Sequence, residues 1–357
     1  MTYDVAIIGA GPAGATLARK LHPDYSVLLL DRRDLLDLKE TDYGKCCGGL
    51  LAPDAQEMIG KMGLAIPKSV LVDPQLFLVR TMDFDSGRER YYQRFYFNMD
   101  RNRFDSWLVS LVPDSVDLAF GCKFTGFIEE SEGVSFSLVH GGKTHQVKAR
   151  ILVGADGAWS KVRKQAFPDI PIKRYVAIQE WFPTAQSVPH YGAFFDKELT
   201  DFYGWTITKD DQLVVGIALE ESADIHRKFD LFKKKLTDSG YSLENSIKRE
   251  GTRICRPTSL KQIVTGNDRV LLIGEAAGFI SPSSAEGISY AMKSASLLAE
   301  SLEEGFYQIG RHYAKKTRGL KQNIVLKNMK KPFMYHPFLR NLVMASGIKS
   351  SKMEMEW

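Results

Sequence analysis

The sequence predicts an α/β protein in which a parallel-sheet domain is interrupted by a mostly antiparallel sheet and followed by a short helical C-terminal segment. Three short apolar runs, at 3–8, 151–153 and 269–273, each end in a glycine turn, as buried parallel strands do. Between the last two lies an aromatic-rich stretch, 176–219, that reads as several strands. Because one sheet resumes after long excursions, its domain is expected to be discontinuous.

The N-terminal residues read strand, turn, helix, strand. A β-branched apolar run at 3–8 leads into a glycine-rich turn, 13–21 has the composition of a helix, and 26–30 is a second apolar run that ends at Asp31. This βαβ unit spans roughly thirty residues, the length that a parallel crossover needs. We therefore expect a Rossmann-type half at the N terminus.

Further along the chain, helices are expected at 100–112 and 287–305, and a β-meander at 116–149. The glycine- and cysteine-rich stretch 41–51 is too irregular for a helix and is expected to form a loop.

Composition places the chain among soluble globular proteins. Of its 357 residues, 44% are hydrophobic and 25% charged, which excludes disordered and fibrous classes. Four cysteines form no CxxC pair, so we predict no metal site and a reducing compartment. The N terminus has no basic leader and no apolar run reaches the ~18 residues of a membrane span, so a cytoplasmic protein is expected.

The positive charge is concentrated near the C terminus. Segment 311–352 holds eleven Lys or Arg and no acid, which leaves 37 basic against 43 acidic groups elsewhere, a net of −6. A solvated cationic helix is the ordinary interpretation. The sharper hypothesis is peripheral attachment to an anionic membrane surface at its inner face. Nucleic acid is the weakest reading of the same charge, and no specific nucleic-acid partner is expected.

Residues 9–14 read Gly-Ala-Gly-Pro-Ala-Gly and fit GxGxxG between a strand and a helix. Gly9 permits the tight turn, Gly11 lets the backbone approach a pyrophosphate, and Gly14 allows close packing of helix on strand. Asp31 is placed to accept hydrogen bonds from an adenosine ribose. Dinucleotide binding is therefore predicted, against the alternative of an ordinary glycine turn.

Two later turns repeat this arrangement. Asp156 and Gly157 follow one buried strand in GADG, and Gly274-Glu275-Ala-Ala-Gly278 follows another. The order GxGPAG, DG with SxVR, and G(D/E)AAG followed by Pro282 and AEGI resembles the FAD-binding fold of p-hydroxybenzoate hydroxylase and its relatives. The resemblance implies that Glu275, where the family usually has Asp, approaches the ribityl chain of FAD. It also implies that the helix start at Gly287 and Ile288 stabilises negative charge on reduced flavin.

Three further segments are similar to geranylgeranyl reductases. Residues 45–50, KCCGGL, resemble their KxCGG loop, and 100–105, DRNRFD, their DRxxFD segment. Tyr203-Gly-Trp205-Thr-Ile207 resembles their YxWxFP strand, with Ile-Thr in place of Phe-Pro. The resemblance implies that Cys47 lies beside the flavin and that Tyr203 and Trp205 line the substrate cavity. These three are the candidate catalytic residues, while packing or disulfide chemistry with Cys46 stays open for Cys47.

The residues that these resemblances and motifs assign to FAD binding come from all the segments above: Gly9, Gly11, Pro12, Ala13, Gly14, Asp31, Arg32, Cys47, Gly48, Arg101, Asp156, Gly157, Gly274, Glu275, Gly278, Pro282, Gly287 and Ile288. The predicted FAD-binding domain covers 1–70, 100–172 and 262–308. The substrate domain covers 71–99 and 173–261, and 309–357 is the basic C-terminal segment.

The function implied is an FAD-dependent oxidoreductase that reduces a carbon–carbon double bond of an isoprenoid or other hydrophobic small molecule. Cys47 or Tyr203 would supply the proton. No second GxGxxG unit is present, so the electron donor is expected to be NAD(P)H bound without one, or a reduced carrier protein. An aromatic hydroxylase or monooxygenase is the alternative within the fold; a halogenase is disfavoured because no WxWxIP stretch occurs. A non-catalytic FAD-binding redox sensor or partner protein is the alternative from another class.

Overall fold

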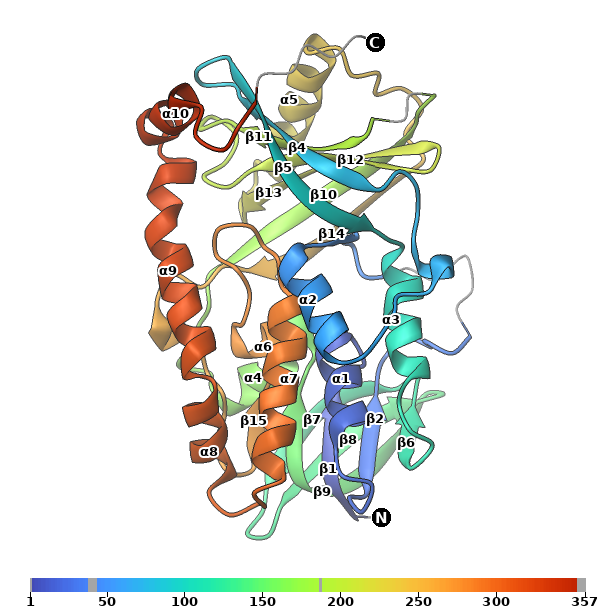
Figure 1. The fold of residues 1–357 in the computed structure, drawn as a ribbon. Helices are drawn as coiled ribbons and strands as arrows, with labels where there is room; N and C mark the ends of the chain where they lie inside the picture. Colours follow the sequence, from blue (N-terminus) through green and yellow to red (C-terminus); the bar gives the residue numbers. More distant parts are fainter. Residues whose placement is uncertain (1, 38–43, 186–187, 352–357) are drawn as a thin grey trace. The chain divides into compact units, whose positions relative to one another are not determined.

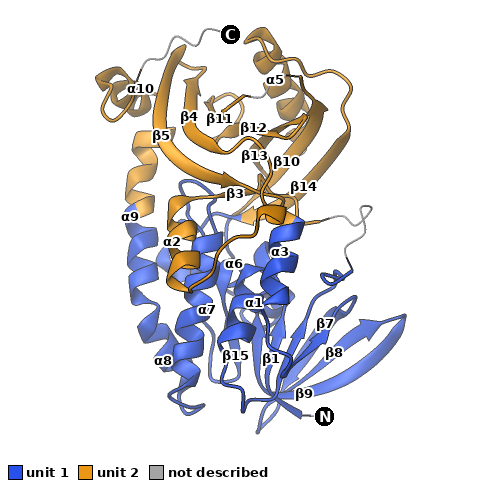
Figure 2. Cartoon of the chain, turned by 45° about the vertical axis from the view of Figure 1, so that its right-hand side comes forward, with its two compact units in different colours: residues 1–43, 102–173, 255–326 blue, residues 44–101, 174–254, 327–357 orange. Residues whose placement is uncertain are grey.

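The computed structural model describes residues 2–37, 44–185 and 188–351 (Figure 1). The chain forms two compact units, coloured separately in Figure 2. Unit 1 contains residues 1–43, 102–173 and 255–326, and unit 2 contains residues 44–101, 174–254 and 327–357. Of the segments singled out above, residues 41–43 of the glycine- and cysteine-rich loop and Lys352 of the basic segment lie outside the described residues.

Unit 1 is built on a seven-stranded sheet ordered β6-β2-β1-β9-β8-β7, with β15 paired to β9. Its strands are β1 (Thr2–Ile8), β2 (Val27–Leu30), β6 (Val116–Ala119), β7 (Lys123–Glu129), β8 (Val134–His140), β9 (Lys143–Gly154) and β15 (Val270–Leu272). The pairs β6·β2, β2·β1, β1·β9 and β9·β15 are parallel. The three apolar runs that end in glycine turns therefore lie next to one another in one sheet, as predicted.

The expected meander at 116–149 is correct only for its last three strands. Strands β7, β8 and β9 pair antiparallel in sequence order, but β6 pairs in parallel with β2. The reason is the connection: helix α3 (Arg101–Ser110) precedes β6 and is the crossover that a parallel neighbour requires.

Helices α1 (Pro12–Lys20) and α7 (Ile288–Leu302) of unit 1 lie side by side. Pro12 suits the first position of α1, where no intrahelical N–H bond is lost. Small side chains such as Ser294 and Ala295 let α7 be buried along most of its length. The remaining helices of unit 1 are α4 (Lys161–Ala166), α6 (Gly274–Ala277) and α8 (Ile309–Lys316), with 3₁₀ turns at Gly157–Trp159 and Leu260–Gln262.

Unit 2 contains an eight-stranded sheet ordered β14-β10-β13-β12-β11-β4-β5-β3. Its strands are β3 (Leu50–Leu51), β4 (Leu76–Asp83), β5 (Arg88–Asn98), β10 (Arg174–Pro183), β11 (His190–Phe195), β12 (Gly204–Lys209), β13 (Gln212–Glu220) and β14 (Lys248–Cys255). Strands β11 and β4 are parallel, whereas β3·β5, β4·β5, β11·β12, β12·β13 and β10·β13 are antiparallel. The mostly antiparallel sheet predicted around 176–219 is confirmed.

Helix α5 (Ile225–Asp238) covers one face of this sheet. Its buried residues Phe229, Phe232 and Leu236 pack in one apolar cluster with Ile178 of β10 and Val215 of β13. Unit 2 also contains α2 (Pro53–Lys61) and a 3₁₀ turn at Lys68–Val70.

The C-terminal segment is helical, as predicted, and continues from α8 into α9 (Arg318–Tyr335) and α10 (Pro337–Ser346). Helix α10 is attached to unit 2 by Arg340, whose Nη2 lies 2.7 Å from a carboxylate oxygen of Asp83 and of Asp85. Among the residues that the structure describes, no helix combines the length and the apolar character needed to cross a bilayer.

Replacing Arg340 with Met should lower the free energy of unfolding by about 3–5 kcal/mol, because it leaves the buried carboxylate of Asp83 without its cation. Arg88→Met is the matched control, since Arg88 is exposed and its guanidinium donates to Asn341 of α10, the helix that contains Arg340. Denaturant unfolding of the full-length protein measures the difference. Adding Asp83→Asn to Arg340→Met should recover part of the loss; equal losses in Arg340→Met and the control would contradict a buried ion pair.

Candidate active site

Three glycine turns of unit 1 meet at the carboxyl ends of β1, β9 and β15. A Cβ added to Gly9 would come within 2.6 Å of the Ala155 carbonyl oxygen, and one added to Gly14 within 1.8 Å of the Gly9 carbonyl oxygen. A Cβ on Gly274 would meet the Ala13 Cβ at 3.0 Å. The first turn therefore contacts both of the others, and side chains at Gly9 and Gly14 have no room.

Gly11 differs from its neighbours in the motif. A Cβ added there would meet nothing within 4 Å, and its φ of −71° is open to any residue. The fold of the protein alone therefore does not require glycine at this position. A glycine here fits the close approach of a pyrophosphate to the backbone.

Asp156 in the second turn provides a further test of whether a cofactor fits. Its Oδ2 accepts the Lys161 and Val162 N–H groups at 2.7 and 3.3 Å, whereas its buried Oδ1 has no hydrogen-bond partner among the described residues. Burial also raises the pKa of this carboxyl. A buried acceptor without a donor, beside a turn with open space over Gly11, fits a ligand that carries hydroxyl groups.

Asp31 lies at the end of β2 and contacts the first turn. Its Oδ2 accepts the Ala10 N–H at 2.8 Å, and its Oδ1 accepts the Arg33 N–H at 2.9 Å. The Arg33 guanidinium adds two longer contacts of 3.3 Å and also reaches the buried Asp105 at 3.0 Å. A ribose hydroxyl at Asp31 would therefore replace one of the long Arg33 contacts. Arg32, the arginine predicted here, is exposed.

The predicted residues of the third turn lie between the end of β15 and the start of α7. Glu275 Oε1 accepts the Cys255 N–H at 2.9 Å, and Gly278 is left-handed with φ +90°. The Pro282 carbonyl accepts from the buried Arg256 at 3.1 Å. Gly287 precedes α7 and Ile288 begins it, and no side chain caps that N terminus in the described part of the chain. Its first N–H groups are thus directed past the end of the helix.

The remaining predicted residues, Cys47, Gly48, Arg101, Tyr203 and Trp205, belong to unit 2. There the Cys47 loop, defined as residues 44–49, lies against β12. A Cβ on Gly48 would come within 2.8 Å of Ile207 Cδ1, and one on Gly49 within 2.3 Å of the Met99 carbonyl oxygen. The two glycines therefore let the loop backbone rest directly on the sheet.

Lys209, at the end of β12, holds the Cys47 loop in place. Its Nζ donates to the Met99 carbonyl and to Asn98 Oδ1, both at 2.7 Å, and lies 3.3 Å from the Gly49 carbonyl. The side chain is buried, and this burial lowers the pKa of Lys209 to about 8. The sequence analysis missed this residue.

The Cys47 thiol has two N–H donors within unit 2. Arg101 Nη1 lies 3.6 Å from Sγ, and the Gly49 N–H lies 3.4 Å from it. Gln179 Nε2 of β10 donates to the Cys47 carbonyl at 3.4 Å. Both Cys46 and Cys47 are free thiols in the structure, and burial raises the pKa of Cys46 well above its usual range. Cys47 is thus the less buried thiol of the pair, with two N–H donors directed at its sulfur.

Trp205 lies on the same sheet face as the Cys47 loop. Gly204 faces α5, because a Cβ added there would meet Phe232 at 2.4 Å. Side chains alternate between the two faces along a strand, so residues 205, 207 and 209 lie on the face opposite to α5. Trp205 and Gln179 both pair with Gly216 of the intervening strand, and a Cβ on Gly216 would meet the indole at 2.4 Å. The ring of Tyr203 lies 6.0 Å from that of Trp205. The indole N–H is buried and has no acceptor among the described residues.

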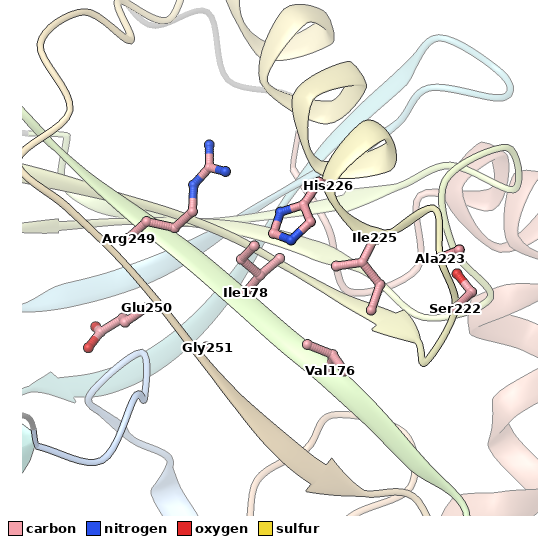
Figure 3. Close-up of a pocket in the computed structure, with 9 residues that line it drawn as sticks. All are labelled: Val176, Ile178, Ser222, Ala223, Ile225, His226, Arg249, Glu250 and Gly251. Carbon is pink, nitrogen blue, oxygen red and sulfur yellow. The ribbon is translucent and has the colours of Figure 1, made fainter.

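A separate cavity of about 360 Å³ lies in unit 2 at the start of α5 (Figure 3). It is lined by Val176, Ile178, Ser222, Ala223, Ile225, His226, Arg249, Glu250 and Gly251. Ile178 belongs to the apolar cluster under α5, so the cavity opens on that face and not on the face of Trp205. None of the predicted site residues lines it.

The structure thus brings the predicted residues together in two groups. Those of the three glycine turns converge in unit 1, and Cys47, Gly48, Arg101, Tyr203 and Trp205 lie on or beside one face of the sheet of unit 2. Lys209 and Gln179 were missed. Asp210 and Asp211 follow Lys209, and this run of three charged residues is typical of an exposed turn. The regular alternation of β12 is the signal that could have found it.

Comparison with known proteins supports an FAD-binding protein. Residues 87–235 match a family model described as an FAD binding domain. The chain is 40% identical over 346 residues to Protein CbrA of Escherichia coli O9:H4 (strain HS), which covers 97% of this chain and 94% of that protein. Protein CbrA of Escherichia coli strain K12 is 39% identical over 346 residues, 97% of each chain.

Solved structures of similar fold have much lower identity. A geranylgeranyl bacteriochlorophyll reductase-like protein of Thermoplasma acidophilum has a TM-score of 0.73 and 20% identity, covering 98% of this chain and 88% of that one. PqsL, a probable FAD-dependent monooxygenase from Pseudomonas aeruginosa, has a TM-score of 0.71 and 16% identity, covering 97% and 99%. At these identities the likeness shows a shared fold.

Gly11→Ala should leave the apoprotein folded and weaken FAD binding by about tenfold or more, because the added methyl occupies the space over the turn. Gly60→Ala is the matched control, since a Cβ there also meets nothing within 4 Å but Gly60 lies in α2 of unit 2. Thermal unfolding of the apoproteins and a flavin titration separate stability from affinity. Unchanged FAD affinity in Gly11→Ala would remove this turn from the cofactor site.

Lys209→Met should change how stability depends on pH. With a pKa of about 8 in the folded protein and about 10.4 when unfolded, Lys209 loses its proton first in the folded state. The wild type should therefore gain about 2–3 kcal/mol relative to Lys209→Met as the pH rises from 8 to 10.5. Urea unfolding across that range measures it, with the exposed Lys234→Met as control. Parallel curves for wild type and Lys209→Met would show that Lys209 is ordinarily solvated.

Proposed function

The chain belongs to the family of the CbrA proteins and is an FAD-dependent oxidoreductase, and from this premise we propose that it reduces a carbon–carbon double bond in a hydrophobic, isoprenoid-like small molecule. The observation that carries the proposal is the setting of Cys47. Its thiol lies between the Arg101 guanidinium and the Gly49 N–H, on the sheet face that presents Trp205. FAD, when bound and reduced, supplies the hydride.

The residues that would hold FAD are those of the three glycine turns. Gly11 leaves room for the pyrophosphate, Gly9 and Gly14 allow the close packing of the turn, and Asp31 and Asp156 offer carboxylate oxygens to hydroxyl groups. The uncapped N terminus of α7 favours negative charge beside it.

Cys47 is proposed to give the proton that completes the reduction. After the transfer its sulfur carries a negative charge, and the two N–H donors at 3.4 and 3.6 Å stabilise that charge. Lys209 keeps the donors in position because it fixes both the Gly49 and the Met99 carbonyls. Arg101 follows Met99 by two residues. The Lys209 amine therefore fixes the backbone next to each of the two donors, Gly49 and Arg101.

Aromatic side chains support a hydrophobic substrate. Trp205 and Tyr203 lie edge to face, and Tyr203 also contacts Phe202 and Phe195. The buried Trp205 N–H has no acceptor among the described residues, so it can donate to a polar end of a bound molecule. We propose that this group of rings is the substrate-facing wall.

An aromatic hydroxylase is the second candidate. What favours it is the similarity of fold to PqsL, whose description is a probable FAD-dependent monooxygenase. The two reactions differ in what reoxidises the flavin, an alkene or oxygen, so they can be separated directly.

The test is anaerobic photoreduction of the holoprotein followed by addition of one acceptor at a time: a polyprenyl diphosphate, a hydroxybenzoate, or oxygen with each of these. Flavin absorbance reports reoxidation, and mass spectrometry reports the product. We expect reoxidation by the alkene with a mass gain of two hydrogens. Oxygen consumption coupled to the aromatic compound would support the hydroxylase, and a lack of response to every acceptor would support a non-catalytic flavoprotein.

Cys47→Ala should slow reoxidation by the alkene by about 10²–10⁴-fold, the usual contribution of a positioned acid, and leave flavin binding and photoreduction intact. Cys46→Ala is the matched control, because it removes the neighbouring thiol. Equal rates in Cys47→Ala and wild type would exclude Cys47 as the acid and leave Tyr203 as the candidate.

A further inference from the structure

We propose that the outer faces of α9 and α10 dock on an anionic lipid bilayer. The C-terminal docking surface is defined by exposed apolar side chains and by the lysines between them: Met329, Phe333, Phe338, Leu342, Val343 and Ile348, with Lys327, Lys330, Lys331 and Lys349. This surface is separate from the candidate active site, and the inference does not depend on the reaction proposed above.

Helix α10 has a buried arginine on its inner side and large exposed apolar side chains on its outer side. Arg340 and Met344 are buried, at 4% and 2% exposure, whereas Phe338 and Leu342 are 64% and 51% exposed. At 3.6 residues per turn, positions two apart lie about 200° around the helix, so 338 and 342 face away from 340 and 344. The inward charge is matched by Asp83 and Asp85. The outward Phe338 and Leu342 stay mostly exposed in the part of unit 2 that the structure describes.

The last turns of α9 also present large apolar side chains. Met329 and Phe333 are one turn apart and 66% and 54% exposed. Lys330 follows Met329 directly and is also exposed. Large apolar side chains flanked by basic ones are typical of helices that lie in the interface of a membrane.

The charge of the segment identifies the partner. Residues 327–351 contain four lysines, Lys327, Lys330, Lys331 and Lys349, besides the buried Arg340, and no acid. Each basic group near an anionic bilayer strengthens binding by about fivefold. A second copy of the same surface would bring like charges together, which disfavours self-association through it. An anionic lipid surface satisfies both the charges and the apolar side chains.

The surface is already ordered in the protein. Ser351 exchanges two backbone hydrogen bonds of 2.9 and 3.1 Å with Tyr91 of β5, and Asn341 accepts from Arg88 Nε. Together with Arg340 these contacts fix the segment on unit 2 before any partner binds. Lipid binding therefore does not have to compensate for ordering a disordered tail.

The experiment compares the full-length holoprotein with variants in vesicle flotation. A truncation before α8 would also remove the buried Tyr313 and Leu320, so point substitutions are used. Phe333→Ser, Phe338→Ser and Leu342→Ser are combined in one variant, and Lys330→Glu with Lys349→Glu in a second. The control combines Ile128→Ser and Ile247→Ser, since these isoleucines are 71% and 51% exposed outside the segment.

Wild type and control should bind vesicles of phosphatidylcholine mixed with phosphatidylglycerol, and bind pure phosphatidylcholine at least tenfold more weakly. Each surface variant should lose about tenfold or more in binding to the mixed vesicles, with unchanged thermal unfolding and flavin content. Failure of the wild type to bind mixed vesicles would overturn the proposal, as would binding of both variants at the wild-type level. A wild-type dimer that the serine variant abolishes, without lipid binding, would assign the surface to a second copy instead.

Discussion

The architecture of unit 1 depends on one close approach of backbone to backbone. Where α1 leaves the first turn, the Gly14 backbone lies so near the Gly9 carbonyl that an added Cβ would sit 1.8 Å from its oxygen. Gly9 in turn contacts the second turn at Ala155, and Gly274 of the third turn contacts Ala13. Because these contacts admit no side chain, the ends of three parallel strands can gather around one small volume. The acids Asp31 and Asp156 are placed beside it as a consequence.

In unit 2, a buried charge holds a loop against the sheet. A lysine buried among carbonyl oxygens loses much of its hydration, and the lowered pKa of Lys209 reflects that cost. The amine compensates by joining the Cys47 loop, Asn98 and Met99 at one point. An apolar side chain of the same size would remove the Lys209 donor from Asn98 Oδ1 and the Met99 carbonyl, whereas the Gly49 carbonyl would keep the Met99 N–H. The main effect of the buried Lys209 charge is therefore to fix the backbone of two segments, the Cys47 loop and residues 98–99.

Local features of the sequence predicted the glycine turns well, because the need for a missing Cβ or a left-handed φ is a property of single positions such as Gly9 and Gly278. Pairing between remote segments was harder. Strand β6 looks the same whether it continues a meander or pairs with β2, since the choice is made by α3 before it. The sequence likewise does not show which of two adjacent arginines points inward. Arg32 is exposed, whereas Arg33 reaches Asp31 and Asp105. The catalytic and cofactor roles of the individual residues stay predictions.

The interleaving of the two units has a consequence for biosynthesis. Val5 of β1 pairs with Ile151 of β9, and β9 receives its other parallel neighbour only when Val270 of β15 has been made. During translation the first strand must therefore wait for most of the polypeptide to leave the ribosome before its sheet closes. Contacts between such distant residues slow folding and prolong the exposure of apolar strands. Neither unit therefore corresponds to a continuous stretch of the polypeptide that could be expressed alone.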